Sequence, residues 1–215
     1  EVAWNFGASI TQKFYLFDRE GSIGVDFYRT EFVNQIVVDV DRSPQTAAFY
    51  NLDGRSFSNS LQVQLDHEVL PRFDLRLAYR WFDVNTTYDG ELLEKPMVAN
   101  HRAFVNLAYE TGNAWKFDAT LSWQSEKRIP GTASNPQEYQ LAEKSPDFFL
   151  LNSHISKGWK NGRIEVYVGV ENITNFKQKN PIIASESPFG QYFDASLIWG
   201  PIFGRSTYAG LRYRI

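Results

Sequence analysis

Cysteine is absent from the 215-residue sequence, and histidine occurs only three times. The first absence excludes disulfides and thiolate metal sites. His67, His101 and His154 share no metal-ligand spacing, so no metal centre is expected. No nucleophile elbow or glycine-rich phosphate loop is present either. We therefore expect neither a cofactor nor an enzyme.

An excess of basic residues is also lacking, as are long apolar runs. The formal net charge is −3 and the pI is about 5.7, which argues against a nucleic-acid partner. No stretch approaches the roughly 20 apolar residues of a membrane-spanning helix. Helical periodicity is missing as well, so helices are not expected to build the fold.

The sequence is instead rich in aromatic residues (16%) and alternates between apolar and polar residues. This period of two predicts β-strands with one apolar and one polar face. The run beginning at Trp115 is the clearest, with apolar residues at odd positions as far as Trp123. Nine such segments are expected, near residues 4–10, 23–40, 61–66, 73–81, 103–109, 115–123, 149–159, 164–170 and 206–215.

The connections between these segments alternate strictly between short and long. Short turns are expected at residues 18–21, 70–72, 111–113 and 161–162, where Asn161-Gly162 is a strong type I′ hairpin signal. Long loops are expected at about residues 43–55, 85–100, 127–147 and 177–203. The predicted sheet therefore has tight hairpins at one end and long loops at the other.

The short turns also predict the pairing of the strands. A three-residue turn at 111–113 pairs Tyr109 with Trp115, and a turn at Asn161-Gly162 pairs Trp159 with Ile164 and Ile155 with Val168. The turn at 70–72 places Asp66 opposite Arg76 on the polar face. Turn chemistry and face assignment agree in these hairpins.

Charged residues interleaved with glycine on the polar face suit a watery lumen. On the apolar face, Trp115 and Trp123 are eight residues apart, which is roughly 20 Å along a tilted strand and close to the apolar band of an outer-membrane barrel. Short turns on one side and long loops on the other are also typical of such barrels. These features favour an all-β, antiparallel transmembrane β-barrel in contact with outer-membrane lipid.

Nine strands do not suit a complete bacterial barrel, which uses an even number of strands and leaves no unpaired edge in lipid. We therefore expect the chain to be the C-terminal part of a larger barrel. Two alternatives stay open: a complete barrel of eight or ten strands with lipase or protease activity, and a soluble β-sandwich that binds carbohydrate.

Three runs near the C-terminus carry a family resemblance: GVENITNF from Gly169 to Phe176, GPIFGR and YAGLRYRI. With them the chain resembles the C-terminal portion of the TonB-dependent outer-membrane receptors, in particular those from Bacteroidetes-type bacteria. The resemblance implies the last nine strands of a 22-stranded barrel in the outer membrane of a Gram-negative bacterium, with 1–215 as one barrel portion and the plug domain absent.

The resemblance also implies function and partners. Such a receptor takes up a siderophore, cobalamin, another metal chelate or an oligosaccharide. Its partners are the remaining barrel strands and plug, TonB through an N-terminal region absent here, and the barrel-insertion machinery. The final strand resembles the C-terminal assembly signal that this machinery recognises, with Tyr208, Gly210, Tyr213 and Ile215 at the matching positions.

Ligand contacts are expected in the long loops, where exposed aromatic side chains can stack on a sugar or a chelate. The candidates are Tyr50, Tyr88, Tyr139, Phe189, Tyr192 and Phe193. The alternative is that these side chains pack the loops against one another.

Overall fold

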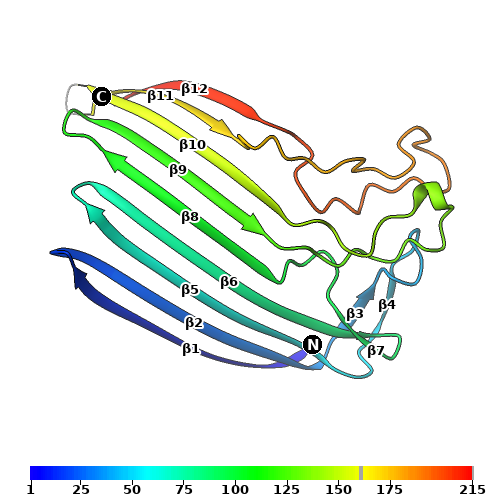
Figure 1. Ribbon diagram of the computed structural model, residues 1–215. Coiled ribbons are helices and arrows are strands. Elements are labelled where there is room, and N and C mark those ends of the chain that lie inside the picture. The colour runs from blue at the N-terminus through cyan, green and yellow to red at the C-terminus, as the bar shows by residue number, and fades with distance from the viewer. Residues whose placement is uncertain (160–161, 215) are drawn as a thin grey trace.

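A single curved antiparallel sheet dominates the computed structural model, which describes residues 1–159 and 162–214. Nine long strands follow one another across this sheet in the order β1-β2-β5-β6-β8-β9-β10-β11-β12, as Figure 1 shows. Their bounds are β1 Val2–Leu16, β2 Arg19–Asn34, β5 Ser56–Leu70, β6 Phe73–Tyr88, β8 His101–Glu110, β9 Trp115–Gln124, β10 Phe148–Trp159, β11 Ile164–Glu171 and β12 Ser206–Tyr213.

Three short strands and one turn of 3-10 helix complete the fold among the described residues. Strands β3 (Ile36–Asp39) and β4 (Ala48–Asn51) pair with each other in a separate two-stranded sheet. Strand β7 (Glu91–Glu94) pairs with the end of β6, and the 3-10 helix η1 covers Gln137–Tyr139. No helix in residues 1–159 and 162–214 is long and apolar enough to cross a membrane.

The nine predicted strands and their order along the sheet are confirmed, and so is the alternation of short turns and long loops. Figure 1 shows the tight turns along one edge of the sheet and the long connections along the other. Strand β1 begins at the long-loop edge and β12 ends at the turn edge. These two strands lie at opposite ends of the strand path, so the sheet is open.

Several predicted boundaries were wrong. The segment 23–40 is interrupted after Asn34, because the next residues leave the main sheet to form β3. Loop 43–55 contains β4, and loop 85–100 begins inside β6 and contains β7. The first turn is centred on Phe17 and Asp18, which both adopt positive φ, rather than on residues 18–21.

The hairpin registers were partly correct. Trp159 pairs with Ile164 and Ile155 with Val168 as expected, although Asn161 of the predicted turn lies outside the described residues. Tyr109 pairs with Phe117 instead of Trp115. The innermost pair is Glu110 with Lys116, so the turn encloses five residues rather than three, and Ala114 within it has a positive φ of 60°. The pairing therefore shifts by two residues and keeps every side chain on its expected face.

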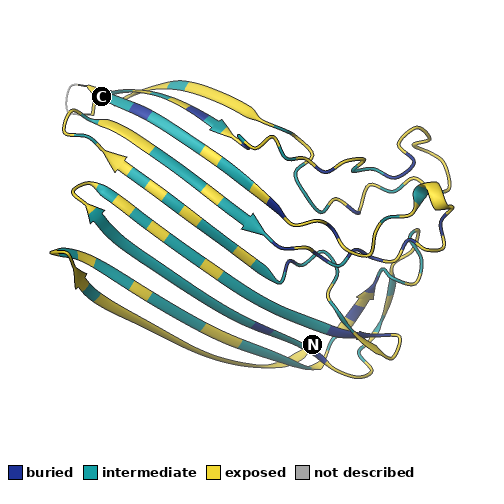
Figure 2. Ribbon diagram, in the orientation of Figure 1, coloured by how far each residue is buried: buried dark blue, intermediate teal, exposed yellow. Residues whose placement is uncertain are grey.

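The sheet has an apolar and a polar face, and the apolar one is not covered by another layer. Large apolar side chains such as Trp4, Ile10 and Leu211 are each about two-thirds exposed (65%, 67% and 68%). Figure 2 shows exposed residues recurring along the strands, whereas buried residues gather toward the long-loop end. The sandwich alternative was wrong, because no second sheet packs on the apolar face of the described residues.

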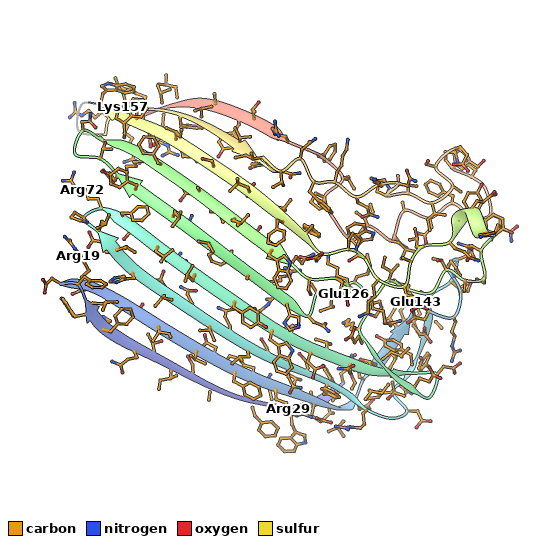
Figure 3. The ribbon with its side chains drawn as sticks, in the orientation of Figure 1. Arg19, Arg29, Arg72, Glu126, Glu143 and Lys157 are labelled. Atoms are coloured by element: carbon orange, nitrogen blue, oxygen red, sulfur yellow. The ribbon has the colours of Figure 1, made fainter. Side chains whose placement is uncertain are left out.

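Aromatic side chains mark both ends of the apolar face. Near the long loops, the Trp123 indole nitrogen donates to Asp147 at 3.0 Å. Near the tight turns, the Lys157 amine lies 5.4 Å from the Trp115 ring centroid and 5.8 Å from that of Trp159. Amphipathic groups at both limits of an apolar band are typical of membrane interfaces. In Figure 3, Lys157 lies at the turn edge together with Arg19 and Arg72.

Candidate functional site

The polar face of the sheet and the loop rim, defined as the long connections at residues 35–55, 89–100, 125–147 and 172–205, form the candidate site. Three hollows lie along the polar face, and their linings include charged or amide side chains from neighbouring strands. A rigid strand array holds these side chains in fixed registers, whereas the loops supply the exposed rim.

Ion pairs and hydrogen bonds join the strands on the polar face near the tight turns. Arg76 donates to Asp66, which confirms the predicted cross-strand pair. Arg212 of β12 and Ser156 of β10 both donate to the Glu165 carboxylate, at 2.9 and 3.0 Å. These contacts satisfy charged groups within the wall itself.

Asp41 and Arg128 connect two parts of the loop rim that are far apart in sequence. The Arg128 guanidinium donates to both carboxylate oxygens of Asp41, at 2.9 and 2.8 Å. Both side chains are less than one-fifth exposed. The backbone nitrogen of Gly131 also donates to Asp41, at 3.1 Å. This bidentate pair therefore fixes loop 125–147 against the connection that carries β3.

Two of the predicted ligand contacts, Tyr50 in the loop rim and Tyr88 at the end of β6, pack against side chains of the rim. The Tyr50 hydroxyl donates to Asp39, which is 1% exposed, at 2.9 Å. Tyr88 is buried beneath the Arg128 guanidinium, 5.6 Å from its ring centroid. Burial raises the pKa of both tyrosines. Their contacts agree with the packing alternative.

Tyr139 and Tyr192 come together on the other side of the rim. Their ring centroids are 5.6 Å apart, and both pack on a small buried cluster of Ile129, Ile183, Ala184 and Leu197. The Tyr139 hydroxyl donates to Glu186 at 2.8 Å. This hydrogen bond raises the pKa of Tyr139.

Phe189 and Phe193 remain accessible at the rim. Phe189 is fully exposed and Phe193 is 36% exposed. The structure therefore separates the six candidates into four that hold the loops together and two that face solvent. A ligand contact by any of them stays a prediction.

The residues that resemble an assembly signal are arranged as interlocking pairs. The Tyr208 ring lies over Gly169 and the Tyr167 ring over Gly210, where a Cβ atom at either glycine would overlap the ring. The Tyr208 hydroxyl is 3.1 Å from His154 Nδ1. Tyr213 lies on the apolar face and is 65% exposed, and Ile215 lies outside the described residues. A role in assembly stays a prediction.

The sequence of this open, two-faced sheet matches a known protein family. The family described as "TonB dependent receptor-like, beta-barrel" matches residues 1–173. The chain belongs to this family. Among curated proteins, none is similar enough to the chain to count as a match.

Solved structures of receptors from this class share the fold of the chain. The pyoverdine receptor FpvA of Pseudomonas aeruginosa, bound to a heterologous pyoverdine, is 15% identical with a TM-score of 0.64, over 98% of this chain and 27% of FpvA. The ferric-catecholate import receptor Fiu of Escherichia coli K12 is 12% identical with a TM-score of 0.63, over 97% of this chain and 27% of Fiu. The siderophore receptor PiuA of Acinetobacter baumannii is 15% identical with a TM-score of 0.61, over 98% of this chain and 28% of PiuA. The chain therefore spans less than a third of the length of each.

The polar face was not among the ligand sites predicted from the sequence. Contacts were expected in the loops, whereas Arg80, Arg102 and Gln124 line one hollow on the strands. Strand alternation already placed these side chains on the polar face. Their proximity depends on the register between β6 and β8. A long connection joins these two strands, so no tight turn specifies that register.

Proposed function

We propose that the chain forms part of the barrel wall of a TonB-dependent outer-membrane receptor that takes up a scarce nutrient. The observation that carries this proposal is the family match to residues 1–173 on an open, two-faced antiparallel sheet. The apolar face contacts outer-membrane lipid, and the polar face lines the lumen. Transport rather than catalysis is the activity that this architecture supports best.

The whole receptor is proposed to contain 22 strands, of which residues 1–215 supply the last nine in a single barrel portion. Its lumen holds a plug, and TonB supplies the force that opens the path. The barrel-insertion machinery recognises the strand that contains Tyr208, Gly210 and Tyr213. The open edges at β1 and β12 support this proposal, because unpaired strand edges are not tolerated in lipid.

The solute is a siderophore, cobalamin, another metal chelate or an oligosaccharide. Two rim side chains, Phe189 and Phe193, are the most accessible of the proposed ligand contacts. Aromatic rings on a rim above a rigid wall can stack on a sugar or chelate before it enters the lumen.

Uptake in a Gram-negative host tests this function. The complete receptor gene is expressed in a strain without its own receptors, and accumulation of labelled ferric siderophores, cobalamin and oligosaccharides is measured. The matched control is the same strain without TonB. The proposal predicts TonB-dependent accumulation of one solute class, with the receptor in the outer-membrane fraction. A receptor in another compartment, or uptake that does not depend on TonB, would contradict it.

A further inference from the structure

Arg80 and Arg102 face each other directly across two neighbouring strands of the polar face. They are register partners in β6 and β8. Gln62 of β5 pairs with Arg80, and Gln124 of β9 pairs with Arg102, so the four side chains form one row across the wall. Like charges in directly opposite positions destabilise a sheet unless another group compensates them.

No such compensating group is present among residues 1–159 and 162–214. Neither guanidinium forms a hydrogen bond or ion pair with another described residue, and Arg80 contacts the Phe82 ring at 4.8 Å. Arg76 and Arg212, on the same face, are paired with Asp66 and Glu165. The two opposed arginines therefore have no acceptor in the part of the chain that the structure describes, although the wall elsewhere supplies carboxylates.

Gln124 provides a second, independent observation. Its Nε2 atom is inaccessible and has no hydrogen-bond partner. A buried amide nitrogen without an acceptor costs free energy, so such atoms point to a missing partner. Gln124 lines the same hollow as Arg80 and Arg102, which places donor groups of three side chains without an acceptor among the described residues around one space.

The hollow itself is cationic and has room for a ligand group. Its volume is about 340 Å³, and no carboxylate lines it. Phe148 forms part of the lining, and the Lys127 amine lies 5.9 Å from that ring. Burial, followed by the charge of Arg102, lowers the pKa of Lys127. The positive charge of Arg102 thus also acts on the loop rim above the hollow.

We propose that Arg80 and Arg102, with Gln124 Nε2, form an oxyanion site on the lumen wall, and that the group it binds is a carboxylate or a similar oxyanion. Guanidinium groups present paired donors that match the two oxygens of a carboxylate. Two sources supply this chemistry: an acidic side chain of the plug, or an anionic group of the transported solute. The site rests on the proposed function in that the polar face must line a lumen.

The test uses the full-length receptor in detergent, with inorganic sulfate as the probe. Arg80→Gln/Arg102→Gln removes both charges, and Arg80→Lys/Arg102→Lys keeps them. Arg76→Gln is the matched control, because Arg76 lies on the same strand and face but already pairs with Asp66. The unfolding midpoint is measured in sulfate and in chloride at equal ionic strength, and the wild-type structure is determined in both salts.

Each outcome either shows whether the solute or the plug supplies the oxyanion, or rejects the oxyanion site. If the solute supplies the group, sulfate occupies the hollow and raises the midpoint of the wild type and Arg76→Gln, and this rise is lost in Arg80→Gln/Arg102→Gln. The lysine variant retains part of the rise. If the plug supplies the oxyanion group, a plug carboxylate contacts both guanidinium groups in the structure, and sulfate does not change the unfolding midpoint. Arg80→Gln/Arg102→Gln then unfolds at a lower temperature than Arg76→Gln.

The inference is overturned if both guanidinium groups contact only water and the double variant behaves like Arg76→Gln. Uptake is measured in parallel on the same variants. A receptor that transports its solute without any acceptor at Arg80 and Arg102 rejects the site alone. A receptor that binds sulfate at these arginines but shows no TonB-dependent uptake rejects the proposed function alone.

Discussion

Arg128 connects three segments of the loop rim. Its guanidinium donates to Asp41 and to the Glu94 carbonyl oxygen, and it also covers the buried Tyr88 ring. Because this ion pair is largely shielded from solvent, removing one partner leaves a poorly solvated charge. The rim therefore depends on a few shielded contacts rather than on loop length or composition.

Asp41→Asn is expected to loosen the rim. The substitution removes the charge that accepts both Arg128 hydrogen bonds, each of which is worth about 1.5–3 kcal/mol when one partner is charged. Amide hydrogen exchange across residues 36–51 should become faster in the variant. Glu126→Gln is the control, because the Glu126–Lys144 pair is about half exposed and such pairs contribute only ~0–1 kcal/mol. Equal effects of the two substitutions would contradict the role of Asp41.

The tyrosine and glycine pairs between β11 and β12 have a steric purpose. Gly169→Ala and Gly210→Ala each place a methyl group where the Tyr208 or Tyr167 ring lies, and this overpacking should cost about 1–3 kcal/mol. The folded fraction in outer membranes, measured on semi-native gels, should fall for both variants.

Gly158→Ala is the matched control for these two substitutions. Its added Cβ would meet the Ala114 Cβ at 3.7 Å, which is an ordinary van der Waals distance. The folded fraction of this variant should remain close to that of the wild type. Full accumulation of Gly169→Ala and Gly210→Ala would show that the tyrosine rings move aside without cost.

At the scale of the element, the long strands could be predicted because every second residue repeats the same polarity. The β9 sequence alternates without a break from Trp115 to Gln124. Tight turns then determine the pairing of strands close in sequence, as at Trp159 and Ile164. The pairing predicted across the Thr111 turn was wrong, because Ala114 adopts a left-handed conformation that its residue type does not favour.

The short strands of the rim were predictable in one place only. Asp89-Gly90 joins β6 to β7 and adopts positive φ at both residues, 49° and 88°, as a type I′ hairpin requires. This dipeptide was a usable signal. The β3–β4 hairpin has no comparable turn, and its contacts join residues far apart in sequence, such as Tyr50 and Asp89. Contacts between residues so far apart in the sequence cannot be predicted from the local sequence pattern.

Strand β9 offers a direct comparison of the two faces. Ala119 lies on the apolar face and Thr120 on the polar face, beside each other midway between Trp115 and Trp123. Ala119→Arg should make folding into lipid less favourable by about 2–4 kcal/mol, because a charge at this depth meets hydrocarbon. Thr120→Arg places the same charge in the lumen, beside Asp118 on the same face, and should change the free energy of folding little.

The comparison is made with the full receptor, by measuring the denaturant concentration at which each variant folds into lipid vesicles. A large effect of both substitutions would point to a crowded polar face. A large effect of Thr120→Arg alone would reverse the assignment of the two faces.

At the scale of the whole molecule, the described residues form an open sheet without a hydrophobic core along its strands. Buried apolar residues lie mainly at the long-loop end, as Figure 2 shows, whereas the sheet exposes both faces. A sheet of this kind is stable only when lipid covers its apolar face and neighbouring strands complete its edges. The family match and the fold therefore support the same account of an incomplete barrel in a membrane.

The absence of cysteine from the chain allows that account to be tested residue by residue. Single cysteines are placed at each position from residue 115 to 124 of the full receptor, any cysteines elsewhere in it being replaced, and spin labels are attached in lipid vesicles. The accessibility of each label to oxygen, which concentrates in lipid, is compared with its accessibility to a water-soluble nickel chelate. We predict lipid accessibility at the odd positions and aqueous accessibility at the even positions. Water accessibility at both the odd and the even positions, or lipid accessibility at the even positions, would contradict the claim that this sheet spans the membrane with its apolar face in lipid.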